Sequence, residues 1–199
     1  IGVGNAVRGN CEMMRRYIVN SVAYWAIEYG MDGFRFDAMS DLDIKTLNEI
    51  RKVLDSIDPK ICTYGEGWDS MGKYLPSDNG PGSISNASKL PKYAFFDSKG
   101  RDAISGSVYD NPNPAGFVNN QSSFHKNPTD VCDSMLGGHK GKPYINASQQ
   151  LNYVEVHDGK TLADLMKYYN PHDDDKAHKK RVEFATSMST LSQGINFVQ

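Results

Sequence analysis

Apolar and polar positions recur along this chain at spacings that predict helices and strands in turn. In residues 11–29 the apolar positions fall at the spacing of one helical face. Asn10 is a suitable N-cap for this helix, and Gly30 can adopt the left-handed conformation that ends a helix. The residues expected on this face are Met14, Tyr17, Ile18, Ser21, Val22, Trp25 and Tyr29.

A period of two follows in residues 32–37, after a very short turn. Apolar Phe34 and Phe36 alternate with polar Arg35 and Asp37. This alternation predicts a short buried strand whose last residue is a carboxylate.

A second helix is expected to begin at Asp41 or Asp43 and to end before Pro59, where a strand over 61–66 follows. Its apolar face would consist of Ile44, Leu47, Ile50 and Leu54. Later strands are predicted over 93–97, 151–158 and 195–198. Later helices are predicted over 101–109, 161–169 and 176–192.

Helices and strands therefore alternate along the sequence, which is the order of a parallel α/β fold. Two long stretches interrupt this order. Residues 67–92 are rich in Pro and Gly and follow the end of a strand, so we interpret them as a functional loop. Residues 110–150 are rich in Asn, Pro, Gly and Ser, and we expect them to be irregular.

Asp37, Glu66 and Asp158 are acidic residues that close the first, second and fourth predicted strands. Parallel sheets and barrels place their chemistry at the carboxyl ends of their strands, so we expect these acids to converge there. For Asp37 and Glu66 the alternative is a structural role at the start of the following helix.

The same strand ends carry sequence motifs. D-G-F-R-F-D at 32–37, Y-G-E-G-W at 64–68 and V-E-V-H-D at 154–158 resemble, in this order, three strand-end motifs of the α-amylase superfamily of glycoside hydrolases. The Y-G-E-G-W form, with R-D-A-I-S-G-S-V-Y-D at 101–110, resembles type I pullulanases, which are starch-debranching enzymes. The resemblance extends over nearly the whole chain.

This resemblance implies the fold class and the domain organisation. It implies an α/β chain that forms part of a TIM-type (β/α)8 barrel, from roughly the third helix to the start of the eighth strand. Because such a barrel takes about 250 residues, residues 1–199 are expected to be an incomplete catalytic domain. The chain also opens in a Gly-rich loop and stops within an apolar run, so we interpret it as a fragment that is inactive alone.

The resemblance also implies that a glycosidic bond is cleaved with retention. Asp37 would be the nucleophile, Glu66 the general acid/base, and Asp158 the group that stabilises the transition state. Retention requires two carboxyl groups about 5–5.5 Å apart. Neighbouring parallel strands lie about 4.8 Å apart, so Asp37 and Glu66 on adjacent strands would meet this requirement.

Three further residues are implied in substrate binding. Arg35 lies on the same side of its strand as Asp37 and would orient that carboxylate. His157 would hydrogen-bond the same sugar ring as Asp158, and Trp68 would stack against a glucose ring. Each of the three has a structural alternative. Arg35 could form an ion pair inside the barrel, His157 could form a structural pair with Asp158, and Trp68 could pack within its loop.

Four positions depart from the family pattern, and two of them, Val3 and Ala6, stand in the first loop where Cys and an acid are common. Gly159 stands where the resemblance predicts Asn after His157 and Asp158, and Ala38 stands where Leu is usual after the nucleophile. Glycine offers no side chain to a sugar, so we expect Gly159→Asn to lower the KM for dextrins or to leave it unchanged, without loss of kcat.

The implied function is hydrolysis of α-1,6-glucosidic branch links in pullulan, dextrins, starch or glycogen. Two alternatives stay open. One is another enzyme of the superfamily, isoamylase-like or acting on α-1,4 links, and the other is a catalytically silent glucan-binding module. The expected partner is an α-glucan polysaccharide in each case. No cofactor is expected to be required, and the sequence does not indicate a metal or calcium site.

Composition gives further expectations about binding partners, thiols and cation sites. A net charge of −2 gives no electrostatic reason to expect nucleic acid, and no apolar run is long enough for membrane insertion. Cys11, Cys62 and Cys132 are widely spaced and odd in number, so we expect buried thiols and no disulfide framework. Residues 173–175 are all Asp, and we interpret them as a solvated acidic turn rather than a cation site.

Overall fold

A computed structural model of the chain describes residues 7–72, 75, 79–109, 115–119, 128–138 and 141–199. The chain divides into two compact units. The first reaches Phe95 and includes Pro143–Ile145, and the second consists of Phe96–Lys142 and Asn146–Gln199.

Three parallel strands organise the first unit. They are β1 (Gly33–Phe36), β2 (Cys62–Gly65) and β3 (Tyr93–Phe96), whose last residue already belongs to the second unit. Phe36 is the register partner of Gly65, and Gly65 is the register partner of Phe95. The strands thus end level with one another, and the residues that follow them emerge at one edge.

The β1 strand is less buried than predicted. Gly33 is exposed and residues 34–36 are only partly buried. Among the described residues β1 hydrogen-bonds to β2 alone, so only one of its edges is covered by another strand.

The α2 helix (Ile44–Ile57) confirms its prediction closely. Asp43 caps it by accepting a hydrogen bond from the Thr46 backbone N–H at 2.9 Å. The predicted face is buried, because it packs on the strands and forms the centre of the first core. The residues of this face are Ile44, Leu47, Ile50 and Leu54.

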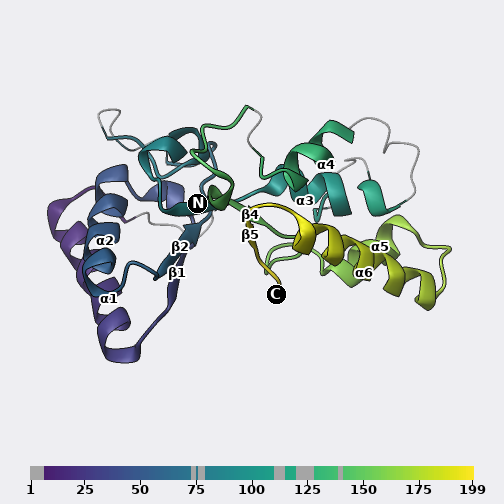
Figure 1. The fold of residues 1–199 in the computed structure, drawn as a ribbon, viewed down its shortest axis with the longest axis horizontal. Helices are drawn as coiled ribbons and strands as arrows, with labels where there is room; N and C mark the ends of the chain where they lie inside the picture. The colour runs from purple at the N-terminus through teal and green to yellow at the C-terminus, as the bar shows by residue number, and fades with distance from the viewer. Residues whose placement is uncertain (1–6, 73–74, 76–78, 110–114, 120–127, 139–140) are drawn as a thin grey trace. The chain divides into compact units, whose positions relative to one another are not determined.

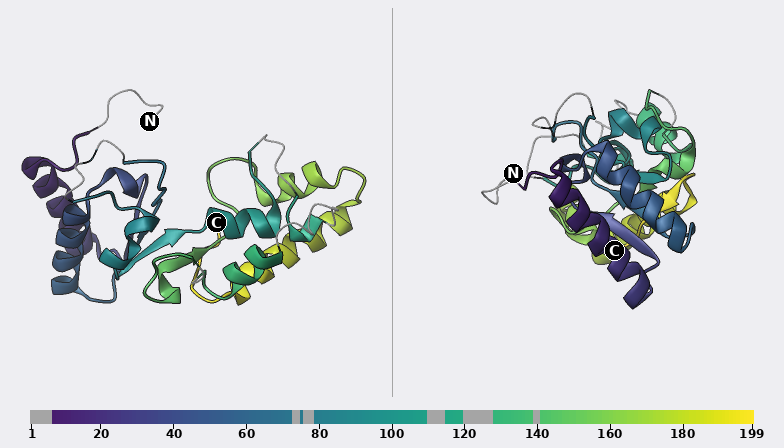
Figure 2. Two further views of the ribbon diagram at one scale, coloured as in Figure 1. Left: turned by 90° about the horizontal axis from the view of Figure 1, so that it is seen from above. Right: turned by 90° about the vertical axis from the view of Figure 1, so that its left-hand side faces the viewer.

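The α1 helix (Glu12–Tyr29) forms and ends at Gly30 as predicted, and the predicted Ile18 and Val22 do pack, but the buried face is rotated away from the predicted aromatic residues. Cys11, not Asn10, is its N-cap residue. The exposed members of the predicted face are its large aromatics, Tyr17 at 70%, Trp25 at 41% and Tyr29 at 58%. The face that packs toward α2 consists of Arg15, Ile18, Val19, Val22 and Ala26. Figures 1 and 2 show the two helices side by side.

Arg15 explains this rotation of α1. Its Nε donates to Thr46 Oγ1 and its Nη2 donates to Asp43 Oδ2, both at 3.0 Å. These bonds let an arginine turn inward with a relative exposure of 7%. A reading of apolar spacing alone assigns arginine to the solvent side.

The second unit pairs β4 (Gln150–Asn152) with β5 (Ile195–Asn196), again in parallel. Parallel strands that alternate with helices confirm the predicted α/β fold, a partial barrel. The predicted strand over 151–158 is too long, because regular pairing ends at Asn152.

Among the described residues of the second unit, four α-helices surround the core. They are α3 (Ser98–Ser105), α4 (Pro128–Met135), α5 (Leu162–Tyr169) and α6 (Asp175–Leu191). The ends of α5 and α6 lie within one residue of the prediction, whereas α3 begins three residues before the predicted start at 101. The α4 helix was not predicted, so the expectation that 110–150 is irregular is wrong there. Short 3-10 helices span Met39–Asp41 (η1), Ile84–Lys89 (η2), Phe117–Asn119 (η3) and Ala147–Gln149 (η5).

The acidic run before α6 serves to begin that helix. Asp174 Oδ1 accepts a hydrogen bond from the Ala177 backbone N–H at 2.7 Å, and Asp173 pairs with Arg181 at 2.7 Å. These two carboxylates therefore have partners within the protein.

The three cysteine thiols are more accessible to solvent than the sequence predicts. Cys11, Cys62 and Cys132 are free and exposed, so the prediction that they are buried is wrong. Over the described part of the chain, no helix is both long and apolar enough to cross a membrane.

Candidate active site

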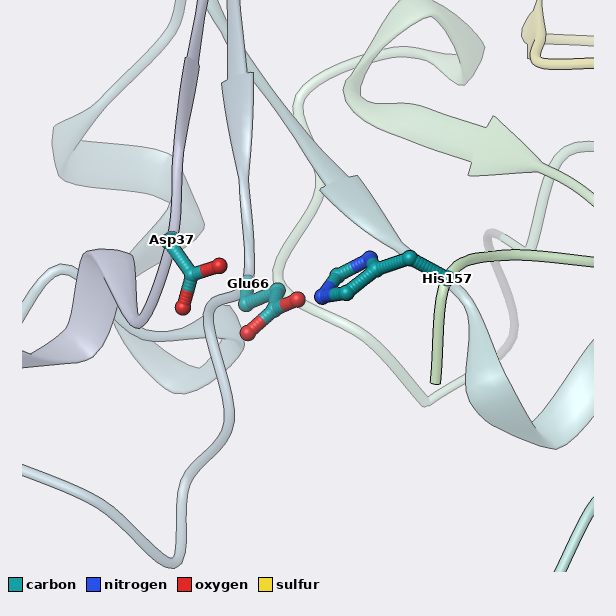
Figure 3. A group of neighbouring side chains, drawn as sticks. All are labelled: Asp37, Glu66 and His157. Atoms are coloured by element: carbon teal, nitrogen blue, oxygen red, sulfur yellow. The ribbon is translucent and has the colours of Figure 1, made fainter. Parts of the chain in front are cut away.

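The first unit places two carboxylates next to each other. Asp37 and Glu66 directly follow β1 and β2, whose last residues are register partners. Carboxylate oxygens of the two residues lie within 4.8 Å of each other. Figure 3 shows both side chains at the ends of these neighbouring strands. This separation suits the distance of about 5–5.5 Å between the carboxyl groups of retaining glycosidases.

Arg35 joins the two carboxylates. Its Nη1 donates to Asp37 Oδ2 at 2.9 Å, and its Nη2 donates to Glu66 Oε1. The planar guanidinium has separate N–H groups for the two acids, which a lysine ammonium could not present in the same fixed geometry. The Arg35 side chain is 24% exposed, so the charges are partly shielded from water.

The two carboxylates differ in access. The Asp37 side chain is 69% exposed, whereas that of Glu66 is 12% exposed. Glu66 Oε2 accepts a hydrogen bond of 3.3 Å from the Ala38 backbone N–H. An open carboxylate beside a buried, hydrogen-bonded one is an arrangement that can divide nucleophilic attack from proton transfer.

Ala38 has an unusual backbone. Its φ of 49° and ψ of 48° are left-handed, and it is the only non-glycine with positive φ in the described part of the chain. For an L-residue this conformation costs roughly 1–2 kcal/mol. The turn it makes leads the chain from Asp37 into η1 and aims the Ala38 N–H at Glu66.

Trp68 is half-buried, two residues beyond Glu66. Its carbonyl accepts hydrogen bonds from Ser40 Oγ at 2.8 Å and from the Met71 N–H at 3.1 Å. These hydrogen bonds hold the start of the 67–92 loop, which is predicted to be functional, against the segment after β1. Its later part is tied to the start of α2, since the Gly82 N–H donates to the Leu42 carbonyl at 2.9 Å.

Asp37 and Glu66 are also the type of oxygen ligand that a cation binds. Arg35 already supplies a positive charge to both of them.

His157 and Asp158 belong to the second unit, where they follow β4 after an irregular stretch. His157 Nε2 lies 3.5 Å from Asp158 Oδ1, and their side chains are 47% and 56% exposed. Because β4 ends at Asn152, these residues do not stand directly at a strand end as Asp37 and Glu66 do.

The stretch that leads to His157 is held by several contacts within the second unit. Arg101 Nη1 donates to the Tyr153 hydroxyl at 3.1 Å. Burial raises the pKa of the Tyr153 phenol, which keeps it neutral as the acceptor of this bond. The Glu155 carboxylate accepts from the Leu162 N–H, and the Lys160 N–H donates to the Val108 carbonyl at 3.2 Å.

The surroundings of Gly159 argue against the expectation that asparagine is tolerated at this position. Its φ is +77°, and a Cβ added there would lie 2.8 Å from both Cγ2 and the carbonyl of Val108. The site thus requires both the left-handed backbone and the lack of a side chain.

We therefore expect Gly159→Ala to lower the free energy of unfolding by about 2–3 kcal/mol. Gly141 is the matched control, because its φ is +80° but a Cβ there meets nothing within 4 Å. Gly141→Ala should cost only about 1 kcal/mol, as backbone strain without a clash. Urea denaturation of both variants, made in the full-length protein that contains this chain, measures the difference. Equal losses of unfolding free energy in the two variants would show that the contact with Val108 does not destabilise Gly159→Ala. Gly159→Asn should lower the free energy of unfolding about as much as Gly159→Ala.

Two contributors to the site were not found from the sequence. They are the Ala38 backbone N–H and the hydroxyl of Ser40, which bind Glu66 and the Trp68 carbonyl. The only available signal was that Ala38 departs from the family pattern, and neither contact could be inferred from residue type alone.

A scan against known protein families finds no match. Individual relatives do match. The pullulanase of Bacillus subtilis (strain 168) is 32% identical over 201 residues, which cover 99% of this chain and 27% of that protein. A crystal structure of pullulanase from Anoxybacillus sp. LM18-11, complexed with maltotetraose, has a TM-score of 0.89 at 39% identity and covers 99% of this chain and 28% of that one.

A debranching enzyme of a second type is also similar. Isoamylase 3, chloroplastic, of Oryza sativa subsp. japonica is 28% identical over 183 residues, which cover 87% of this chain and 21% of that protein. The chain thus spans about a quarter of the length of these relatives, 27% for the bacterial enzyme. The resemblance seen in the sequence motifs is confirmed by these matches.

Proposed function

Because the chain corresponds over nearly all of its length to part of a pullulanase-type enzyme of the α-amylase superfamily, we propose that the protein containing it hydrolyses α-1,6-glucosidic branch links in α-glucans. The observation that supports this most is the carboxylate pair Asp37 and Glu66, bridged by Arg35 at the ends of adjacent parallel strands. The relatives include both pullulanases and an isoamylase, which agrees with debranching.

In the proposed mechanism Asp37 attacks the anomeric carbon while Glu66 protonates the departing glycosidic oxygen. Asp37 is suited to attack because its side chain is open and its orientation is fixed by Arg35. Arg35 Nη2 donates to Oε1 of Glu66, whereas Oε2 accepts only the longer bond of 3.3 Å from the Ala38 N–H, so Oε2 is the oxygen that delivers the proton. In the second step Glu66 takes a proton from water, which then releases the sugar from Asp37 with net retention.

The remaining residues have supporting roles in this proposal. Asp158 and His157 bind hydroxyl groups of the distorted sugar, and Asp158 stabilises the positive charge of the transition state. Trp68 stacks against a glucose ring, with its backbone held by Ser40. The reaction balances without a cofactor.

The stereochemistry of the product tests the mechanism. Initial hydrolysis followed by NMR should show the new reducing end in the α configuration, before it equilibrates with the β form. An initial β product would contradict a nucleophilic role for Asp37. Binding of pullulan without release of any sugar would favour the glucan-binding module instead.

A further inference from the structure

Ser40 links the segment after Asp37 to the segment after β2. Its backbone N–H donates to the Glu66 carbonyl at 3.2 Å, and its hydroxyl donates to the Trp68 carbonyl at 2.8 Å. The residue has no exposed surface. One buried serine thus binds the backbone carbonyls of both Glu66 and Trp68, the two residues after β2 that have proposed roles.

The two segments also cross at van der Waals distance around Ser40. A Cβ on Gly65 would lie 2.5 Å from the Phe36 carbonyl, and one on Gly72 would lie 2.1 Å from the Ser40 carbonyl. Side chains are excluded on both sides of the crossing, so the backbones of 36–40 and 65–72 touch directly. The Ser40 hydroxyl has two acceptors within this contact, the Trp68 carbonyl at 2.8 Å and the Glu66 carbonyl at 3.5 Å, and both lie in the segment after β2.

The strained turn at Ala38 is the other half of this arrangement. Its left-handed conformation places two nearby donors, the N–H groups of Ala38 and Ser40, opposite Glu66. The cost of the turn is offset where those donors are satisfied. The Ser40 hydroxyl then extends the link by two residues, to Trp68.

We propose that Ser40 is a positioning residue, which fixes the backbone of Glu66 and Trp68 relative to Asp37. This inference rests on the proposed function, because it takes the roles of Asp37, Glu66 and Trp68 from it. Catalytic groups must be held within about 0.5 Å of their productive geometry, and a displacement of about 1 Å can cost 10²-fold in rate. The hydroxyl of Ser40 contributes that precision without touching the sugar.

A serine with a purely structural role provides the control. Ser105 has no exposed surface either, and its hydroxyl donates to the Arg101 carbonyl at 2.9 Å. Ser40→Ala and Ser105→Ala each remove one buried hydroxyl that donates to a backbone carbonyl. Their effects on the midpoint of thermal unfolding should therefore be similar.

The experiment compares both variants in the full-length protein that contains this chain, at a temperature at which circular dichroism shows them folded. Hydrogen exchange of the peptide over 66–72 should accelerate about tenfold in Ser40→Ala and stay unchanged in Ser105→Ala. Turnover of pullulan should fall about 10- to 100-fold in Ser40→Ala, with kcat carrying more of the loss than KM. Ser105→Ala should keep both kinetic constants.

Two results would overturn the proposal. One is unchanged exchange over 66–72 in Ser40→Ala, which reports on the link whether or not pullulan is the substrate. The other is accelerated exchange with kcat unchanged, which would reduce Ser40 to a structural residue. If the unsubstituted protein released no sugar from pullulan, the proposed function would fail, and with it the role assigned to Ser40.

Discussion

Replacing Asp37 by Asn is expected to reduce the rate of pullulan hydrolysis by at least about 10⁴-fold, because an amide cannot form the covalent glycosyl intermediate. Glu66→Gln should cost about 10²–10⁴-fold, through loss of the proton that assists the leaving oxygen. Both substitutions preserve side-chain shape, and an amide oxygen can still accept from Arg35. Reducing-sugar release gives the rates, and thermal unfolding monitors the fold.

Asp32 provides the matched control for these variants. It is an exposed acid at the opposite end of the same strand, and its backbone carbonyl accepts from the Cys62 N–H at 2.9 Å, a bond that Asp32→Asn retains. Asp32→Asn should therefore leave both turnover and stability unchanged. Residual activity of Asp37→Asn within tenfold of the unsubstituted protein would remove Asp37 as nucleophile.

The 199 residues expressed alone are expected to release no sugar from pullulan and to show no cooperative unfolding. The outer edge of β1 has no strand partner among the described residues, and open edges of this kind favour association between chains. The α1 helix adds an aromatic cluster to the surface, where Trp25 and Tyr29 rings lie 4.6 Å apart and Trp25 is 41% exposed.

Urea denaturation followed by circular dichroism, together with light scattering, tests this prediction. A gradual loss of signal and a mass above that of the monomer are expected. The full-length protein, assayed in parallel, shows that the substrate and the assay are sound. A sharp transition at monomer mass, accompanied by release of maltotriose from pullulan, would show that this segment suffices for fold and activity.

Local pattern predicted the elements well where one face of an element is apolar and the other polar. The α2 helix is such a case, since Leu47 and Ile50 are buried as the spacing predicts and the cap, Asp43, is one of the two predicted starting residues. The α1 helix has apolar residues on more than one side, so the spacing did not decide which side packs. Arg15 decided it, through bonds to residues 28 and 31 positions later in the chain.

Some residues of the candidate site could likewise be placed from the sequence, and others could not. Asp37, Glu66 and Arg35 could be placed from the sequence, because strand alternation and the order of strands fix which side chains share an edge. The link through Ser40 could not, because it depends on a left-handed Ala38 and on the close crossing at Gly72. Backbone conformations of this kind are set by contacts distant in sequence.

Digestion of pullulan by the full-length protein tests the central claim most directly, since pullulan consists of maltotriose units joined by α-1,6 links. Separation of the products should show maltotriose as the main sugar, and Asp37→Asn should yield none of it. Panose or isopanose as the main product would mean cleavage at α-1,4 links and would contradict the proposed debranching activity.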